Sequence, residues 1–244
     1  FNIWERDYTG PLPMCLVWGE DTRKKMARMT DKPVVAVGPP IHYAVNAYAP
    51  DTITGEKKRL GENALIFPTH STHLDTVLFD QKHLLSMAHE IKQKFDTVRF
   101  CLYWHDVVSG FAKPFLESEF ECVTAGHMFD PYFYSRLKAL LSVADHSFGN
   151  TLGTQSGLSI GMGVPHTIFP QTIRAFSESG EALPTIEEAG LQTCQNLFLG
   201  QESVISREQH DFAQQVFGFA FVKKEHEMLA LLEQAERMYC AQPR

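Results

Sequence analysis

The chain has 244 residues, 44% of them hydrophobic and 21% charged, which is typical of a globular protein with a core of its own. Its formal net charge of −7 argues against a broad electrostatic grip on nucleic acid, which needs clustered lysine and arginine. No apolar run is long enough to span a bilayer, and the five cysteines form no Cys-x-x-Cys pair. We therefore expect a cytoplasmic protein with free thiols.

Short apolar runs recur along the chain, separated by longer segments with helical spacing. Their apolarity is continuous rather than alternating, which is typical of parallel strands covered on both faces. The runs are Met14–Trp18, Pro33–Val37, Ala64–Phe67, Val98–Trp104, Phe120–Thr124, Asp145–Phe148 and Pro165–Phe169.

Two of the intervening segments carry clear helix signals. Asp80–Phe95 has an aspartate suited to cap the helix and an apolar face that includes Leu84 and Ile91. Asp130–Ala144 begins with Asp-Pro, which is typical of a helix start. The polar segment 49–63, with its glycines and proline, predicts an exposed loop.

After residue 185 the strand-like runs stop and helical patterns follow. They cover Ile186–Leu199, Ser206–Phe217 and Glu225–Tyr239, and Ser206 with Gln209 forms a capping-box pattern. Strands alternating with helices predict a doubly wound α/β fold with a parallel, Rossmann-like sheet and a helical carboxyl-terminal extension. We divide the chain into a region with two strands at 1–62, a Rossmann-like domain at 63–185 and the helices of 186–244. The first region is either a connection between two lobes or the remnant of an amino-terminal lobe.

Ligands of such sheets bind beyond the carboxyl ends of the strands, near helix N-termini. One polar turn follows the run Asp145–Phe148 and precedes a helix rich in small residues. Its candidate ligand-binding side chains are Ser147, Asn150, Thr151 and Thr154. The free N–H groups of a helix start suit a phosphate, although the same residue types also favour an ordinary turn.

Histidines follow other strand-like runs at the same predicted edge. His105 closes Val98–Trp104 and His70 follows Ala64–Phe67, and we take both as candidate catalytic residues. Thr69 and Ser71 flank His70 as candidate donors to a substrate. His127, after Phe120–Thr124, is placed near a base or ribose by element order alone.

A metal site built on His70, His73 and Asp75 is an alternative for this loop. The pair His70 and His73 has no clear third ligand beyond the nearby Asp75, and zinc normally takes three or four. Satisfied loop histidines are the other alternative.

The chain resembles the carboxyl-terminal half of a GT-B glycosyltransferase, in particular bacterial capsule and surface-polysaccharide transferases of the CDP-glycerol glycerophosphotransferase-like and sialyltransferase-like groups. The resemblance rests on Val17-Trp18-Gly19-Glu20, Gly38-Pro39, the polar turn from Ser147 to Thr154, and Gly163-Val164-Pro165. Where those families carry His-Pro at the end of a middle strand, this chain has His105-Asp106.

The resemblance implies a GT-B type lobe at 63–185 that binds a nucleotide-sugar donor, with His105 at the donor phosphate and the side chains of the polar turn around it. It implies a saccharide or lipid-linked acceptor. No Asp-x-Asp motif is present, so we expect a reaction without a metal or other cofactor. Peripheral membrane contact and the oligomeric state are left open.

Three other functions suit the same predicted fold. They are a UDP-sugar 2-epimerase, a metal-dependent hydrolase built on His70, His73, Asp75 and His105, and a non-catalytic nucleotide-binding module.

Overall fold

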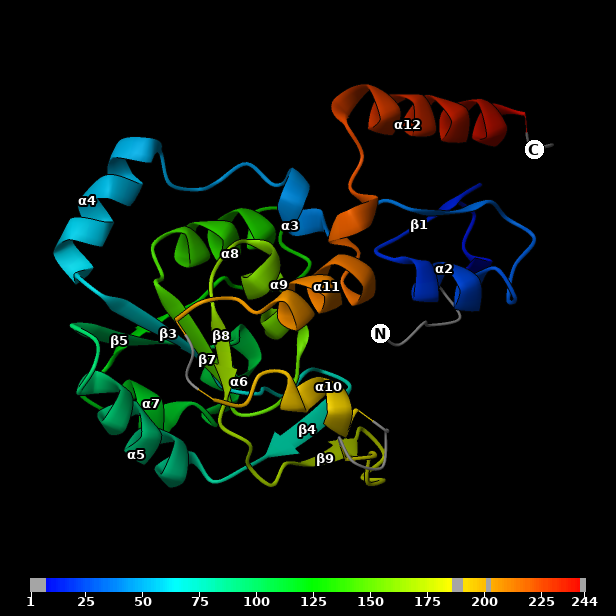
Figure 1. Ribbon diagram of the computed structural model, residues 1–244. Helices are drawn as coiled ribbons and strands as arrows, with labels where there is room; N and C mark the ends of the chain where they lie inside the picture. The colour runs from blue at the N-terminus through cyan, green and yellow to red at the C-terminus, as the bar shows by residue number, and fades with distance from the viewer. Residues whose placement is uncertain (1–7, 186–190, 201–202, 242–244) are drawn as a thin grey trace. The chain divides into compact units, whose positions relative to one another are not determined.

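The computed structural model describes residues 8–185, 191–200 and 203–241 (Figure 1). The chain forms two compact units: one combines the residues up to Tyr43 with those from His210 onward, and the other contains Ala44–Gln209. The predicted division at 62/63 and 185/186 stays a prediction. Within the described part of the chain, no helix is both long and apolar enough to cross a membrane.

A five-stranded parallel sheet forms the centre of the larger unit. Its order is β6-β5-β3-β7-β8, with β6 at Glu121–Val123, β5 at Thr97–Cys101, β3 at Asn63–Phe67, β7 at His146–Gly149 and β8 at His166–Ile168. The chain runs outward from β3 through β5 to β6 and then returns to β7, on the other side of β3. This reversal confirms the predicted doubly wound fold and puts its switch point between β3 and β7.

Both faces of this sheet are covered by helices (Figure 1). On one face, Ile66 of β3 and Phe100 of β5 pack in a core with Leu84 of α5 (Gln81–Lys92) and Phe115 of α7 (Lys113–Leu116). The helices α8 (Phe133–Ser142) and α9 (Thr154–Gly161) lie on the other face. Burial on both faces explains why the strand sequences read as continuous apolar runs.

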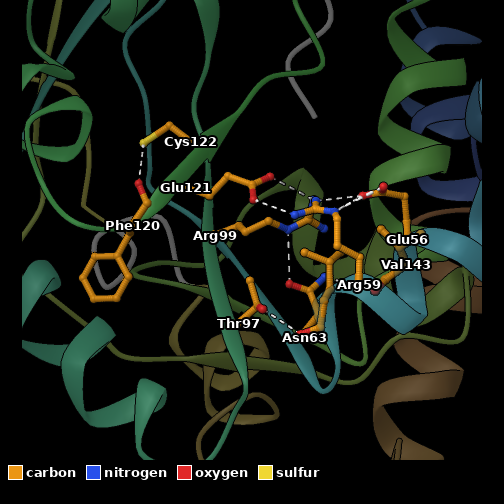
Figure 2. A network of polar contacts seen from close by, with 10 residues as sticks. Glu56, Arg59, Asn63, Thr97, Arg99, Phe120, Glu121, Cys122 and Val143 are labelled. Atoms are coloured by element: carbon orange, nitrogen blue, oxygen red, sulfur yellow. Dashed lines mark hydrogen bonds and ion pairs between the residues drawn. The ribbon is translucent and has the colours of Figure 1, made fainter.

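A buried arginine ties three strands together on the face opposite that core (Figure 2). Arg99 of β5 is 2% exposed, and its Nε donates to Asn63 Oδ1 at 3.1 Å. Its Nη1 lies 3.7 Å from Glu121 Oε1 of β6, and Arg59 reaches the same carboxylate from α4 (Pro50–Leu60), with Nη1 3.5 Å from Oε2. A charged group at this depth needs such partners, so the network helps to fix β3, β5 and β6 together.

The prediction that 49–63 is an exposed loop is wrong. Residues Pro50–Leu60 form helix α4. Pro50 stands at the helix start, the basic residues Lys57, Lys58 and Arg59 fill the last turn, and Gly61 follows in the left-handed region with φ 62°. A proline in the first turn, basic residues in the last turn and a glycine after it are typical of a helix. The polar composition of the segment had instead suggested a loop.

All the predicted strands of the large sheet are present, and two further strands were not foreseen. β4 (Asp75–Leu78) and β9 (Arg174–Ser177) pair in an antiparallel ribbon. The helix predicted from Asp80 is α5, and Asp80 caps it by accepting from His83 N at 3.0 Å. The helix predicted from Asp130 begins later, because Asp130 instead accepts from Tyr132 N in a turn before α8.

The carboxyl-terminal segment is helical, as expected. It forms α10 (Gln192–Asn196), α11 (Arg207–Val216) and α12 (Glu225–Cys240), while positions 186–190 of the first predicted helix lie outside the described residues. The capping box is confirmed, since Ser206 N donates to Gln209 Oε1 at 3.0 Å and Gln209 N to Ser206 Oγ at 3.2 Å.

The smaller unit is built around a parallel pair of strands, β1 (Cys15–Val17) and β2 (Val34–Ala36), joined through α2 (Glu20–Met26). Beyond β2 the short α3 (Pro40–Tyr43) follows, and η1 (Phe219–Phe221) precedes α12. Gly218 has φ 80°, and a Cβ there would run into the carbonyl oxygen of Trp18. Only glycine fits this close approach of two backbones.

Candidate functional site

A cavity of about 110 Å³ opens at the carboxyl edge of the large sheet. The ends of β3 and β5, the loop after β6, and helices α8 and α9 supply its walls. Its lining, mostly apolar and aromatic, includes Phe67, His70, Tyr103, Gly126, Tyr134 and Thr154. We call it the first cavity. Its position beside the switch point is where ligands of doubly wound sheets bind.

His70 is the ionisable side chain best placed in this cavity. Its Nδ1 lies 3.2 Å from the carbonyl oxygen of Ser71, which can only accept, so Nδ1 carries the hydrogen and Nε2 of the neutral ring has a free lone pair. The ring stacks on Tyr103 with centroids 4.2 Å apart. The residue is exposed at the surface, but the protein groups around the ring lower the pKa of His70 by desolvation, against the opposing effects of the Ser71 carbonyl and the Asp106 carboxylate.

The loop that carries His70 is anchored on both sides. Thr69 N donates to Asn150 Oδ1 at 2.7 Å, on the side of β7, and Ser71 N donates to Asp106 Oδ1 at 3.2 Å, on the side of β5. The Ser71 hydroxyl accepts from Val77 N at 3.0 Å and is buried. Thr69, Ser71 and Asn150 therefore hold the loop in place, and the structure gives the Ser71 and Asn150 side chains partners inside the protein.

The start of α9 faces the same cavity. Gly153 is the N-cap, and Thr154 and Gln155, in the first turn, both line the first cavity. Ser156 N donates to the Gly153 carbonyl oxygen at 3.1 Å, whereas the N–H groups of Thr154 and Gln155 have no partner among the described residues and lie at the positive end of the helix dipole. An anion in the first cavity would meet these groups together with His70.

Ser147 is not part of this cavity. It is fully buried within β7, and its hydroxyl lies 2.8 Å from Nδ1 of His166, whose Nε2 lies 3.1 Å from the Ser156 hydroxyl. Beside them, His146 Nε2 lies 2.9 Å from the Thr167 hydroxyl. We call these side chains the closed cluster. Burial lowers the pKa of His166 to about 3 and that of His146 to about 4, so both rings are neutral.

His105 and His127 lie beside the first cavity rather than in its lining. His105 belongs to α6 (Trp104–Ser109), and its buried Nδ1 has no hydrogen-bond partner among the described residues. The His127 ring stacks on Trp104 with centroids 4.6 Å apart, and its Nδ1 accepts from Phe129 N at 3.0 Å. The structure thus brings His70 and Thr154 into one lining, which does not include these two histidines.

Several residues of the first cavity were not predicted from the sequence. Tyr103 lies two positions after the end of β5 and two before His105, and Gln155 follows Thr154 in the first turn of α9. Phe133 and Tyr134 come from the first turn of α8, a segment for which the sequence predicted a helix but no site. The rule that ligands bind at strand ends could have indicated Tyr103, whereas nothing local marks the α8 aromatics.

Thr151 lies apart from Thr154 and lines a second cavity of about 330 Å³. The loops that follow β8 and β9, together with α10, supply the rest of its walls. Across the ranges that the structure describes, no three His, Cys, Asp or Glu side chains gather in a way that could hold a metal ion. The grouping of His70, His73, Asp75 and His105 that a metal-dependent hydrolase would need is therefore not formed by these residues.

No protein-family model matches the sequence, and no curated protein matches it. Among solved structures, Phytolacca americana UGT2 complexed with UDP-2fluoro-glucose and pterostilbene is 17% identical, over 93% of this chain and 54% of that one, with a TM-score of 0.41. TcCGT1 in complex with UDP is 12% identical over 96% and 57%, with a TM-score of 0.45.

Arabidopsis thaliana UGT89C1 is 12% identical over 92% of this chain and 52% of its own, with a TM-score of 0.38. The chain thus spans about half the length of the solved structures it matches.

Proposed function

We propose that this chain is the donor-binding part of a GT-B glycosyltransferase that acts on a nucleotide-sugar. One observation carries the proposal: the first turn of α9 and the neutral ring of His70 face a single aromatic cavity beside the switch point of a doubly wound sheet. An aromatic cavity suits a planar base, and a helix start suits its phosphates.

His70 supplies the chemistry that such a transfer requires. The acceptor hydroxyl oxygen forms a bond to the anomeric carbon, and the bond between that carbon and the phosphate oxygen breaks with its electron pair leaving on the nucleotide. His70 Nε2 takes the hydroxyl proton, because Nδ1 already donates to the Ser71 carbonyl. The amides of α9 stabilise the negative charge that gathers on the leaving phosphate.

The finer parts of the proposal rest on the family resemblance. They are a role in surface-polysaccharide synthesis, a saccharide or lipid-linked acceptor, a contact between His105 and the donor phosphate, and a reaction without a metal. The buried Nδ1 of His105 lacks a hydrogen-bond partner among the described residues. Buried polar atoms normally have one, which supports a contact between this nitrogen and a ligand or an ordered water.

The test is the pair His70→Ala and His73→Ala. His73 lies on the same loop, is exposed and does not line the first cavity, so it controls for changes in the loop itself. For the full-length protein with a donor found by thermal-shift screening of CMP, CDP, UDP, GDP and their sugars, we expect His70→Ala to reduce transfer by about 100-fold. His73→Ala should stay close to the parent.

Donor binding should fall far less than transfer in His70→Ala, because the phosphate contacts come from α9. Equal transfer rates in the two variants would contradict the role of His70. A chain that binds none of the screened nucleotides would contradict the proposed function as a whole.

A further inference from the structure

The second cavity differs from the first in the chemistry of its walls. Apart from Pro170 and Ile173, its lining consists of hydroxyl and amide side chains: Thr151, Gln171, Thr172, Thr185, Gln192 and Gln195. Over the described residues that form it, the lining contains no ionisable group. Such walls can both donate and accept hydrogen bonds but cannot neutralise a charge.

Gln195 gives this cavity a directed donor. The side chain is 5% exposed, and its Oε1 accepts from Leu152 N at 3.2 Å and from the Thr151 hydroxyl at 3.4 Å. Because the Leu152 amide can only donate, the oxygen must face the loop. The Nε2 amide group is then left without a partner among the described residues, in a side chain that lines the cavity.

The neighbouring Gln171 provides a comparison, because its amide makes hydrogen bonds within the protein at both ends. Its Oε1 accepts from Asn150 Nδ2 at 3.0 Å, and its Nε2 donates to the carbonyl oxygen of Asp80 at 3.1 Å. Both of its polar ends are used inside the protein. A nearly buried amide with one end unused costs free energy unless a ligand or water satisfies it.

One loop connects the two cavities. Thr154, at the start of α9, lines the first cavity, and Thr151, three positions earlier, lines the second. A phosphate held at the first turn of α9 would therefore leave the group attached to it next to the loop that borders the second cavity.

We propose that the second cavity binds the neutral, hydroxyl-rich glycosyl group of the substrate and discriminates against acidic sugars. This assignment rests on the function proposed above and specifies its sugar class. Sugar hydroxyls pair with amides and hydroxyls of the kind that line this cavity. The carboxylate of a uronic or sialic acid would lose water there without gaining a cationic partner.

Saturation-transfer NMR titrations of the whole chain test the selectivity directly. The neutral probes are glucose, galactose, mannose and N-acetylglucosamine, and the acidic probes are glucuronate, galacturonate and N-acetylneuraminate. We expect at least one neutral sugar to bind with a dissociation constant about tenfold or more below that of every acidic sugar. Failure of all neutral sugars to bind, or equal binding of an acidic one, overturns the proposal.

Two variants test whether the second cavity is where the sugars bind. Gln195→Glu keeps an oxygen for Leu152 N but removes the N–H donor and adds a negative charge, so neutral-sugar binding should weaken by roughly fivefold or more. Gln192→Lys adds a cation and should gain binding of glucuronate, a gain that unfolding cannot produce. Thr193→Val, exposed on the same helix and outside the lining, is the matched control.

Thermal-shift measurements of nucleotide binding on the same proteins separate the two levels of the proposal. If nucleotides bind but acidic sugars bind as well as neutral ones, or Gln192→Lys gains nothing, the sugar assignment fails and the donor-binding function stands. If neutral sugars bind as expected but no nucleotide does, the proposed function fails and the second cavity remains a saccharide site.

Discussion

The closed cluster and the first cavity sit on neighbouring strands of one sheet, yet their polar groups are used in opposite ways. In the closed cluster, both nitrogens of His166 meet serine hydroxyls, and the His146 ring meets Thr167. In the first cavity, His70 has one nitrogen bonded to a carbonyl, and the other has no hydrogen-bond partner among the described residues. The difference teaches that a histidine near strand ends is a candidate for chemistry only when the fold leaves one of its atoms unpaired.

Removing the His166 ring should give the largest effect on stability. His166→Leu removes the imidazole partner of the buried Ser147 and Ser156 hydroxyls, which keep only their contacts with the Pro165 carbonyl and the Gly153 amide, and we expect a loss of about 2–4 kcal/mol in the free energy of unfolding. Urea denaturation followed by circular dichroism measures it. His83→Leu, at an exposed position of α5, should change stability by less than about 0.5 kcal/mol.

Acid should destabilise the fold through the closed cluster. The folded-state pKa values of His166 and His146 lie at about 3 and about 4, below the ordinary value of 6.5. The unfolded chain therefore binds more protons, and the stability present above pH 6.5 falls as the pH drops toward these values, by up to about 1.4 kcal/mol per pH unit for each ring.

Urea denaturation at several pH values between neutrality and about pH 4.5 tests this dependence. His166→Gln, which retains a polar side chain without an imidazole, should have a shallower slope than the parent chain. An unchanged slope would show that these rings do not govern the acid response.

The smallest expected effect isolates a single backbone group of the first cavity. Thr154 is the first residue of α9, where proline fits without loss of a helical hydrogen bond, and Gly153 before it is extended. Thr154→Pro should leave the unfolding free energy nearly unchanged but weaken nucleotide binding by roughly threefold to tenfold, through loss of one N–H donor. Thr154→Val, which keeps that amide, should bind better than Thr154→Pro in calorimetric titrations.

The parallel sheet could be predicted because a strand that is buried on both faces has a short, continuous run of apolar residues. Helix α4 could not be predicted in this way, because it is exposed and therefore as polar as a loop. Only Pro50 at its start and Gly61 at its end indicate a helix. The ribbon of β4 and β9 is short, and its pairing joins segments far apart in the chain, which no local pattern reveals.

The candidate site was predictable in place but not in detail. The turn after β7 was identified as a whole, whereas its side chains turned out to face different surroundings: Ser147 the closed cluster, Asn150 the Thr69 amide, Thr151 the second cavity and Thr154 the first. The direction of each side chain depends on the backbone geometry and on partners from distant segments, such as His166 and Gln195. The sequence of the turn alone predicts neither.

The contact between Gln195 and Leu152 has a practical meaning for anyone who wishes to work with a minimal piece of this protein. Gln195 belongs to the helical segment after the sheet, which by composition alone looks dispensable, yet its carbonyl group holds the amide of a loop that shapes both cavities. A fragment that ends at residue 185 would keep every strand of the described chain. It would still lose the hydrogen bond from Leu152 N to Gln195, which holds the loop between the two cavities.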